Sequence, residues 1–461
     1  MDFWKDTLGA PTKIVAPMVD ASELPWRILS RRYGAELCYT PMLHSAIFCK
    51  DPKYRKEALA TCEEDKPLIV QFCGNDPKIL LEAALLAEDH CCAIDINFGC
   101  PQAIAKRGHY GAYLQDEWPL IEEIVSTLSK SLKVPVTCKI RRFEELEKTI
   151  TYAKMLESAG CKLLTLHGRT REMKGPLTGL ADWDYVTEVR KVLSIPVISN
   201  GNVQCMQDME RCLEHTGAVG VMTAEGNLYN PYLFTYSMPP CWQPAKEYLN
   251  LCKQYPCPFS YIRGHLFKLF HHLLSLSENA SLRIKLGAAN SMEQFDEIAE
   301  ELKSRYLPYH EGEQQWSETH ESGTQNLVIP PWLCQSYIRM PPEEHLKLVE
   351  CKQKESEEIN KQNEHPNKRK YKDSEGNPIS RKMMKKLRRL GRRPEKMDSV
   401  CKKTMEKCTN CVNPLGAKCL NKLCKKCCKD KCFLENMDCP GHRILVKTRR
   451  QMAAFFQNEV K

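Results

Sequence analysis

The fold is indicated first by Asp95-Ile96-Asn97-Phe98-Gly99-Cys100-Pro101. The apolar run Ala93–Phe98 is typical of a buried strand, and Pro101 stops it because proline cannot donate to a strand ladder. Gly99 lets the backbone bend, so the Cys100 side chain can face a cavity. In a barrel of parallel strands, chemistry takes place at this end of the strand. The stretch predicts that Cys100 is a proton donor or nucleophile, although buried cysteines more often serve as small apolar fillers.

Short apolar runs alternate with amphipathic stretches along the first 230 residues. The predicted strands are Ile14–Val19, Leu37–Thr40, Leu68–Gly74, Ala93–Phe98, Val136–Arg141, Leu163–His167, Val197–Asn200 and Val219–Thr223. The predicted helices are Pro77–Asp89, Pro119–Leu132, Leu146–Ala159, Trp183–Leu193 and Met206–Thr216. Repeated strand–helix units favour a parallel sheet, and eight strands predict an α/β fold of the (β/α)₈ TIM-barrel type.

Polar residues, together with the small or apolar residues beside them, follow the ends of these strands, and the carboxyl ends of barrel strands meet in one mouth. They include Pro17, Met18, Gln71, Asn97, Cys100, Lys139, Arg141, His167, Arg169, Asn200, Gly201, Asn202, Ala224 and Glu225. Glycine-containing turns after the seventh and eighth strands are the usual phosphate cradle of such a barrel. Lys139 can hold the negative charge of a reduced flavin ring, and Gln71 and Asn97 can bond its polar edge. Flavin mononucleotide (FMN) therefore fits better than a dinucleotide, since no Gly-x-Gly-x-x-Gly fingerprint follows a strand.

Several short motifs occur along the barrel region. They are Ala16-Pro17-Met18-Val19, Leu68-Ile69-Val70-Gln71-Phe72, Asp95-Ile96-Asn97-Phe98-Gly99-Cys100-Pro101, Lys106-Arg107-Gly108-His109-Tyr110-Gly111-Ala112-Tyr113-Leu114, Cys138-Lys139-Ile140-Arg141, His167-Gly168-Arg169-Thr170 and Asn200-Gly201-Asn202. Taken together, these motifs make the sequence similar to the flavin-dependent tRNA-dihydrouridine synthases. They follow the family's order from Lys13 to Phe234. Within the family, the sequence most resembles the eukaryotic branch described as acting on uridines 16 and 17 of the tRNA D-loop.

The resemblance implies roles for the site residues. The implied cofactor-binding set is Pro17, Met18, Val19, Gln71, Asn97, Lys139, His167, Asn200, Gly201, Asn202, Ala224 and Glu225. The implied substrate contacts are Lys106, Arg141, Arg169, Arg263 and Lys268. Bacterial members often carry Gly-Arg at the last phosphate position, where this chain has Ala224-Glu225-Gly226. Since that arginine is missing, the phosphate must be neutralised by backbone N–H groups or by another cation.

The implied reaction is a two-step relay. NADPH reduces the flavin, which then gives hydride to C6 of a uracil ring while Cys100 donates a proton to C5. A thiol with a pKa of about 8.5 is mostly protonated at neutral pH, so it needs no activation as a donor. The segment Lys106–Leu114 resembles the family's mobile active-site loop. A uracil within folded tRNA must swing out to reach the flavin, so further RNA contacts are expected outside the barrel.

The C-terminal half is predicted to provide those contacts. After a barrel domain over residues 1–240, residues 241–310 are expected to form a small all-α tRNA-binding domain. Residues 311–400 are expected to be a disordered linker. Between Lys361 and Lys407 there are 17 Lys and Arg against 6 Asp and Glu, whereas the whole chain has a net charge of +9. Such a basic tract is typical of a segment that binds RNA or is recognised by a nuclear-import receptor. It can also be only a solvated linker.

A second motif lies in residues 401–461, which are predicted to form a small cysteine-rich module with a basic tail. Its predicted metal ligands are Cys408, Cys411, Cys419, Cys424, Cys427, Cys428, Cys439 and His442. Eight ligands fill two tetrahedral zinc sites, and pairs at x₂ spacing can turn around one metal. The pairing stays open, Cys432 is left over, and no ligand position remains free for catalysis, so the sites are expected to be structural.

Composition also bears on location. The sixteen cysteines before residue 400 show no framework of spacings, which fits a reducing compartment. The N-terminus lacks the layout of a secretory signal, and no stretch is long enough for a membrane span. We therefore expect a monomer in the cytoplasm, the nucleus or both, without membrane contact.

Two other functions stay open at this stage. A flavin barrel that reduces or oxidises a small pyrimidine, of the dihydroorotate dehydrogenase kind, would share the chemistry but would not need the basic tract or the cysteine cluster. A zinc-bearing RNA-binding protein with an inactive barrel would not need Cys100, Lys139 and His167.

Overall fold

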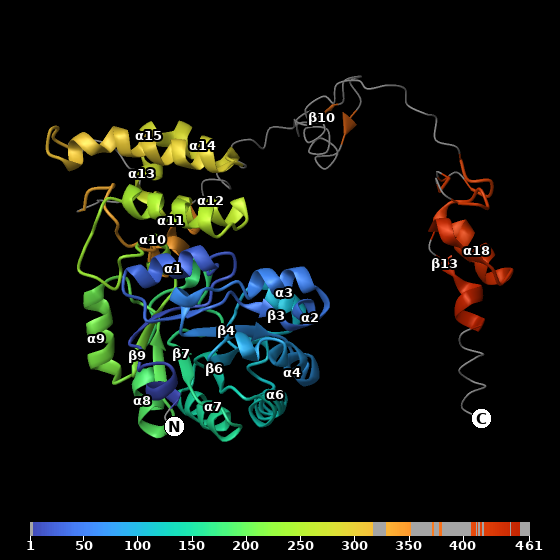
Figure 1. Ribbon diagram of the computed structural model, residues 1–461, viewed down its shortest axis with the longest axis horizontal. Helices are drawn as coiled ribbons and strands as arrows, with labels where there is room; N and C mark the ends of the chain where they lie inside the picture. Colours follow the sequence, from blue (N-terminus) through green and yellow to red (C-terminus); the bar gives the residue numbers. More distant parts are fainter. Residues whose placement is uncertain are drawn as a thin grey trace. The chain divides into compact units, whose positions relative to one another are not determined.

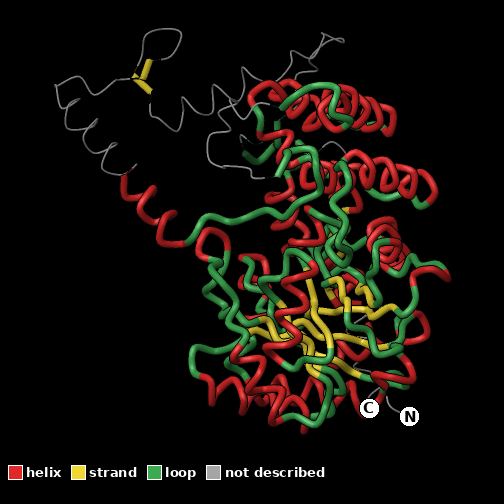
Figure 2. Tube along the Cα trace, turned by 90° about the vertical axis from the view of Figure 1, so that its left-hand side faces the viewer, coloured by secondary structure: helices red, strands yellow, loops and turns green. Residues whose placement is uncertain are grey.

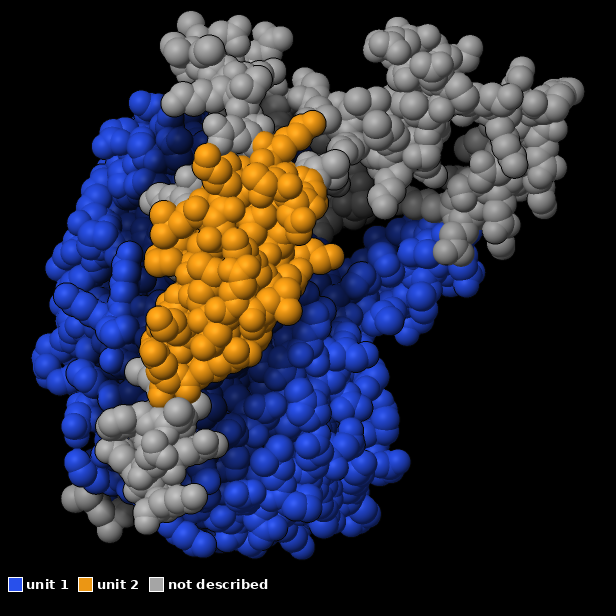
Figure 3. All heavy atoms as spheres, turned by 90° about the vertical axis from the view of Figure 1, so that its right-hand side faces the viewer, with its two compact units in different colours: residues 1–357 blue, residues 358–461 orange. Residues whose placement is uncertain are grey.

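The computed structural model describes residues 3–316, 329–351, 371–372, 378–379, 407–411, 413, 415–416, 419–442 and 444–451. The chain forms two compact units, Met1–Glu357 and Glu358–Lys461, which Figure 3 draws in different colours. The first unit contains a barrel and a layer of helices, and the described core of the second consists mainly of cysteines. The finer domain boundaries after residues 240, 310 and 400 stay predictions.

Eight parallel strands form a closed barrel in the first unit, as the sequence predicts. They are β1 (Lys13–Val15), β2 (Leu37–Tyr39), β4 (Leu68–Cys73), β5 (Ala93–Asn97), β6 (Val136–Arg141), β7 (Leu164–His167), β8 (Val197–Asn200) and β9 (Gly220–Thr223). The barrel closes because β1 pairs with both β2 and β9, and β2 also pairs with β4. A further strand, β3 (Leu43–His44), pairs with β4 and was not predicted, since two residues show no periodicity.

Helices surround the barrel strands (Figures 1 and 2). They include α1 (Leu24–Arg32), α2 (Ser45–Lys50), α3 (Pro52–Ala58), α4 (Pro77–Leu85), α6 (Trp118–Ser131), α7 (Leu146–Ser158), α8 (Asp184–Val192) and α9 (Met206–Thr216). The start of α4 shows why the pattern was readable. Asp76 Oδ1 accepts from Lys78 N and Ile79 N, and Pro77 occupies the first helical position, where its missing N–H costs nothing. The largest apolar cluster of the barrel lies between strands β4–β8 and the helices α4, α6, α7 and α8.

Two short helices lie in loops that follow barrel strands. The first, α5 (Ala103–Gly108), comes soon after β5, and the second, α10 (Glu225–Tyr229), comes directly after β9. Both therefore belong to the carboxyl-end mouth of the barrel, where the predicted site residues are expected to meet.

The predicted helical region forms a layer that packs on α1 and α10 (Figure 1). It contains α11 (Trp242–Gln254), α12 (Phe259–Leu269), α13 (His271–Ser275), α14 (Ala280–Ala288) and α15 (Met292–His310). Trp26 of α1 is fully buried there and stacks on His265 of α12, with ring centroids 3.9 Å apart. The layer and the barrel thus share one apolar core, which fixes the helices relative to the mouth.

The segment 329–340 folds back onto the start of the helical layer. Cys241 N donates to Trp332 O at 2.7 Å, and Cys334 N donates to Pro239 O at 2.8 Å. Residues 342–351 then form a helix. Among the described residues, no helix is both long enough and apolar enough to cross a lipid bilayer.

The second unit is described in part. It contains β10 (Tyr371–Lys372), β11 (Pro378–Ile379), α18 (Lys425–Leu434), β12 (Asp438–Cys439) and β13 (Ile444–Leu445). Strand β10 pairs with β11, and β12 pairs with β13. Apart from β10 and β11, the basic tract predicted between residues 361 and 407 lies almost entirely outside the described residues.

Candidate functional site

Cys100 follows the carboxyl end of β5, where a chain of side chains fixes its backbone. Asn97 Oδ1 accepts a hydrogen bond from Cys100 N at 2.8 Å. Asn97 Nδ2 donates to Gln71 Oε1 at 2.9 Å, and Gln71 Nε2 donates to Asp95 Oδ2 at 2.7 Å. The predicted residues Gln71, Asn97 and Cys100 therefore form one connected unit at the mouth.

Asp95 anchors this chain inside the barrel and was not singled out from the sequence. Its carboxyl group is fully buried, and its other oxygen accepts from Thr137 Oγ1 at 2.6 Å. Burial raises the pKa of Asp95 to about 6. One signal in the sequence could have identified it. A short strand that is buried on both faces contains an acidic residue, and a buried carboxyl group requires a hydrogen-bond partner.

The loop that contains α5 packs directly on Cys100. Ala112 N donates to Cys100 O at 3.1 Å. Gly111 has a φ of +65°, and a Cβ placed there would lie 2.9 Å from Cys100 O. Lys106, on α5, is exposed and available to a ligand. Burial raises the pKa of the Cys100 thiol, which keeps it protonated at neutral pH.

Arg141 holds the loops together and is almost fully buried. Its Nε donates to Gly99 O at 2.9 Å, and its Nη1 donates to Thr170 O at 2.7 Å and Met173 O at 3.1 Å. The described hydrogen bonds of this guanidinium all go to backbone carbonyl groups of the loops around Cys100, and its predicted contact with substrate stays a prediction.

Lys139 and His167 lie on neighbouring strands of the same mouth. Lys139 Nζ donates to Asn200 Oδ1 at 2.8 Å, and Asn200 Nδ2 donates to Met222 O at 2.7 Å. Burial, aided by the charge of Arg141, lowers the pKa of Lys139 to about 8. The same two causes hold the pKa of His167 well below its usual range, so its ring is neutral at pH 7.

Arg169 connects His167 to the turn after β8. Its Nη1 lies 2.9 Å from His167 Nε2, which must accept because a guanidinium only donates. Its Nη2 donates to Asn202 Oδ1 at 2.8 Å. Asn202 also exchanges two hydrogen bonds with the Ala181 backbone, so its side chain organises the turn. Gly201 has a φ of +118°, and a Cβ there would lie 2.6 Å from the Ala181 side chain.

Glu225 has a partner that the sequence did not reveal. Arg339 Nε donates to Glu225 Oε2 at 2.8 Å, and Arg339 Nη2 donates to Oε1 at 2.5 Å. These residues are 114 positions apart, so no local pattern could have paired them. A guanidinium thus lies beside Ala224-Glu225-Gly226, a turn that has no arginine of its own.

The remaining predicted residues are arranged as follows. Pro17 and Met18 are half-buried in the loop after β1, where Met18 N donates to Ser22 Oγ at 2.8 Å, and Val19 is exposed. In the helical layer, Arg263 Nη2 donates to Ala289 O and Lys268 Nζ donates to Gly264 O. These two cations therefore bond backbone groups within the layer.

The donor set of the mouth fits FMN. Lys139 supplies a cationic amine at one side, and the Asn97 amide has a second N–H beyond the one that it donates to Gln71, which is itself fully buried beneath it. The turn at Gly201 is too tight for a side chain, which leaves its backbone accessible for close approach. Arg169 and Arg339 place guanidinium groups beside the turns that follow β8 and β9.

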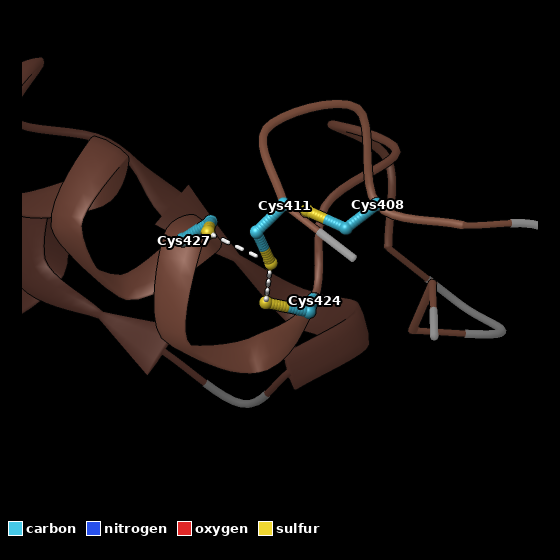
Figure 4. Close-up of side chains that lie close together, drawn as sticks. All are labelled: Cys408, Cys411, Cys424 and Cys427. Carbon is cyan, nitrogen blue, oxygen red and sulfur yellow. Dashed lines mark hydrogen bonds between the residues drawn. The ribbon is translucent and has the colours of Figure 1, made fainter. Parts of the chain in front are cut away.

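The cysteine cluster of the second unit separates into two groups of four ligands. Cys408, Cys411, Cys424 and Cys427 form the first group (Figure 4), and Cys419, Cys428, Cys439 and His442 form the second. Within each group the ligand atoms lie within 4.8 Å of one another. All eight predicted ligands are thus brought together, and the groups interleave along the chain. Cys432 belongs to neither group and is buried, with Sγ 4.0 Å from Cys428 Sγ.

Comparisons with known proteins agree with this geometry. A family model described as "Dihydrouridine synthase (Dus)" matches residues 14–306. A mouse tRNA-dihydrouridine(16/17) synthase-like protein is 48% identical, over 97% of this chain and 91% of its own. A rat protein of the same name is 47% identical, over 97% and 98% of the two chains. A Schizosaccharomyces pombe tRNA-dihydrouridine(16/17) synthase is 44% identical, over 73% of this chain and 90% of its own.

Proposed function

The chain belongs to the dihydrouridine synthase family, and on this premise we propose that it reduces uridines of the tRNA D-loop, at positions 16 and 17, to 5,6-dihydrouridine. FMN is the proposed cofactor and NADPH the proposed reductant, in line with the NAD(P)(+) in the relatives' names. The observation that carries the proposal is Cys100, a protonated thiol held at the mouth by Asn97 beside Lys139.

Bound FMN would supply the hydride that reaches C6 of the uracil ring. The chain's own residues supply the rest. Cys100 holds the proton for C5 on its sulfur, and the Asn97–Gln71–Asp95 chain holds the Cys100 backbone in place. Lys139, held by Asn200, offers positive charge to the flavin ring. His167 is neutral and accepts from Arg169, which leaves its Nδ1–H as a donor.

RNA recognition is proposed for cations on the α5 loop and on the helical layer. Lys106 is exposed on α5, in the loop that packs on Cys100, and Lys268 is half-buried on α12, the helix that packs on α10. For Arg141, Arg169 and Arg263 we propose an indirect part, because their described hydrogen bonds hold loops and helices in place. The basic tract before the cysteine module adds sequence-independent attraction to phosphate.

We also propose one structural Zn²⁺ in each ligand group of the second unit. Four thiolates, or three thiolates and one imidazole, are typical tetrahedral zinc ligands and leave no open position. Helix α18 would then present Lys425, Lys426 and Lys429, all outside the buried core, to RNA. We also propose that the protein is a monomer and that it resides in the cytoplasm, the nucleus or both.

The decisive experiment measures dihydrouridine at each D-loop position in tRNA from cells that lack this protein. Wild type, Cys100→Ala and Cys92→Ala are each returned to these cells. Cys92 is the matched control because it lies at the opposite end of β5 from Cys100. We expect loss of dihydrouridine at positions 16 and 17, rescue by wild type and Cys92→Ala, and no rescue by Cys100→Ala.

Other outcomes identify the alternatives. Unchanged dihydrouridine, in cells where no second synthase covers the same sites, contradicts the proposal. If the purified protein also carries no flavin, the inactive RNA-binding protein is favoured. Turnover of free pyrimidine at a rate equal to that of tRNA favours a small-molecule enzyme, for which the basic tract and the zinc ligands have no use.

A further inference from the structure

The extended segment 332–340, here called the strap, returns from the helical layer to the mouth of the barrel. Ser336 Oγ donates to Gln204 O at 2.7 Å, and Gln204 Nε2 donates to Tyr337 O at 3.1 Å. The Tyr337 ring stacks on Tyr229 of α10, with centroids 5.0 Å apart. The strap is therefore attached both to the loop after β8 and to α10, which follows β9, the two places where the phosphate cradle is expected.

Arg339 lies on the strap two residues after Tyr337 and forms a bidentate pair with Glu225. The two side chains are 43% and 41% exposed, so a ligand in the mouth can reach them. The pair uses Nε and Nη2 of the guanidinium. Among the described residues, Nη1 of Arg339 is bonded to no acceptor, which leaves a donor for one further anionic oxygen.

A second arginine approaches the same place from the turn after β8. Arg169 Nη2 donates to Asn202 Oδ1 at 2.8 Å, and the charges of both Glu225 and Arg339 act on the pKa of Arg169. Arg169 therefore places a positive charge beside the turn after β8, and Arg339 places one beside the turn after β9. Glu225, considered alone, would repel a phosphate dianion at this position.

We propose that Arg339 is a phosphate-binding residue of the flavin site, which supplies the cation that the Ala224-Glu225-Gly226 turn lacks. Glu225 is the positioning residue, since its two carboxylate oxygens hold the guanidinium in a fixed orientation. The inference rests on the proposed function, because the anion is the phosphate of FMN. It also gives the strap a role: the chain beyond the helical layer completes the cofactor site of the barrel.

The test compares two flavins that differ only in the phosphate. Full-length protein is stripped of flavin, and its dissociation constants for FMN and riboflavin are measured by flavin fluorescence, without turnover. For Arg339→Ala we expect a loss of roughly 10- to 100-fold in FMN affinity, the range of one charge-assisted hydrogen bond, and an unchanged affinity for riboflavin. Arg339→Lys keeps the charge and should recover part of the FMN affinity.

A double variant and a control separate the charge from the fold. Arg339→Ala leaves Glu225 facing the phosphate, so Arg339→Ala with Glu225→Gln should bind FMN more tightly than Arg339→Ala alone. Arg32→Ala removes an exposed arginine that lies 4.0 Å from Glu64, away from the mouth, and should change neither constant.

The outcomes are distinct. Equal losses for FMN and riboflavin in Arg339→Ala, or no loss for either, overturn the role of Arg339 while the proposed function stands. A wild-type protein that binds neither flavin overturns the proposed function, and the phosphate role of Arg339 with it.

Discussion

The amide of Cys100 donates to Asn97 Oδ1 over 2.8 Å, so the turn that presents the thiol is held by the last side chain of β5. The same oxygen accepts from Gly99 N at 3.1 Å. The side-chain amide oxygen of Asn97 thus accepts from two backbone N–H groups at the point where the strand ladder ends. The position of the proposed proton donor therefore depends on the last residue of β5 as well as on the loop that follows.

Replacing Asn97 should therefore impair activity and stability together. Asn97→Ala leaves two backbone N–H groups and Gln71 Oε1 without their partner, and unsatisfied buried groups cost about 1–3 kcal/mol. We expect the free energy of unfolding, measured with urea, to fall by about that amount. Dihydrouridine formation should fall at least about tenfold, a loss equivalent to about 1.4 kcal/mol. Asn290→Ala, at an exposed amide in the helical layer, is the control and should change neither.

Gly111 should tolerate no side chain, because the space beside it is filled by Cys100. In Gly111→Ala the new Cβ would lie 2.9 Å from Cys100 O, at a φ of +65°. Steady-state kinetics should show a kcat reduced at least about tenfold. Gly217 has a similar φ of +61° but nothing within 4 Å, so Gly217→Ala isolates the cost of backbone strain. Equal kinetics for the two variants would contradict the packing of the loop on Cys100.

Lys139 should make the free energy of unfolding depend on pH in the alkaline range. Burial lowers its pKa from 10.5 to about 8. Between these values the unfolded chain binds a proton that the folded chain lacks, so the lysine's contribution to stability rises with pH and is least favourable below pH 8. The difference in free energy of unfolding between wild type and Lys139→Met, in flavin-free protein, should therefore rise from pH 7.5 to 10. A pH-independent difference would show that the amine titrates normally.

Single ligand variants should remove the two proposed metal ions separately. Elemental analysis of the purified wild type should give two zinc equivalents. Cys411→Ala should retain only the ion of the Cys419 group, and His442→Ala only that of the Cys408 group. Cys432→Ala should keep both ions, since Cys432 belongs to neither group. Loss of both ions in Cys411→Ala would mean that the two sites fold as one cooperative unit.

Much of the fold was readable from the sequence because its signals are local. Barrel strands are buried on both faces, so each of the eight appears as a short apolar run, and β6 and β8 were predicted to the residue. Asp76-Pro77 predicted the start of α4 for a local reason as well, since the cap bonds residues only two and three positions ahead. The first strand ends at Val15, earlier than expected, and the loop that follows it contains Pro17.

The sequence predicted those site residues that lie at the carboxyl ends of the barrel strands. Cys100, Lys139 and His167 meet at one mouth because parallel strands bring their carboxyl ends together, and the sequence alone required this. It did not reveal that Arg141 bonds backbone carbonyl groups, nor that Asp95 anchors the Cys100 turn. Those roles depend on which neighbours a buried polar group finds after the barrel has closed.

The sequence by itself determined the class of fold, the cysteine at the end of β5 and the eight candidate metal ligands, because periodicity and short spacings are properties of neighbouring residues. Only the tertiary structure decided the interleaved grouping of those ligands and the pairing of Arg339 with Glu225. The physical reason is that contacts across many residues have no period in the sequence. They are set by the packing of the whole chain, which brings the strap back to the mouth of the barrel.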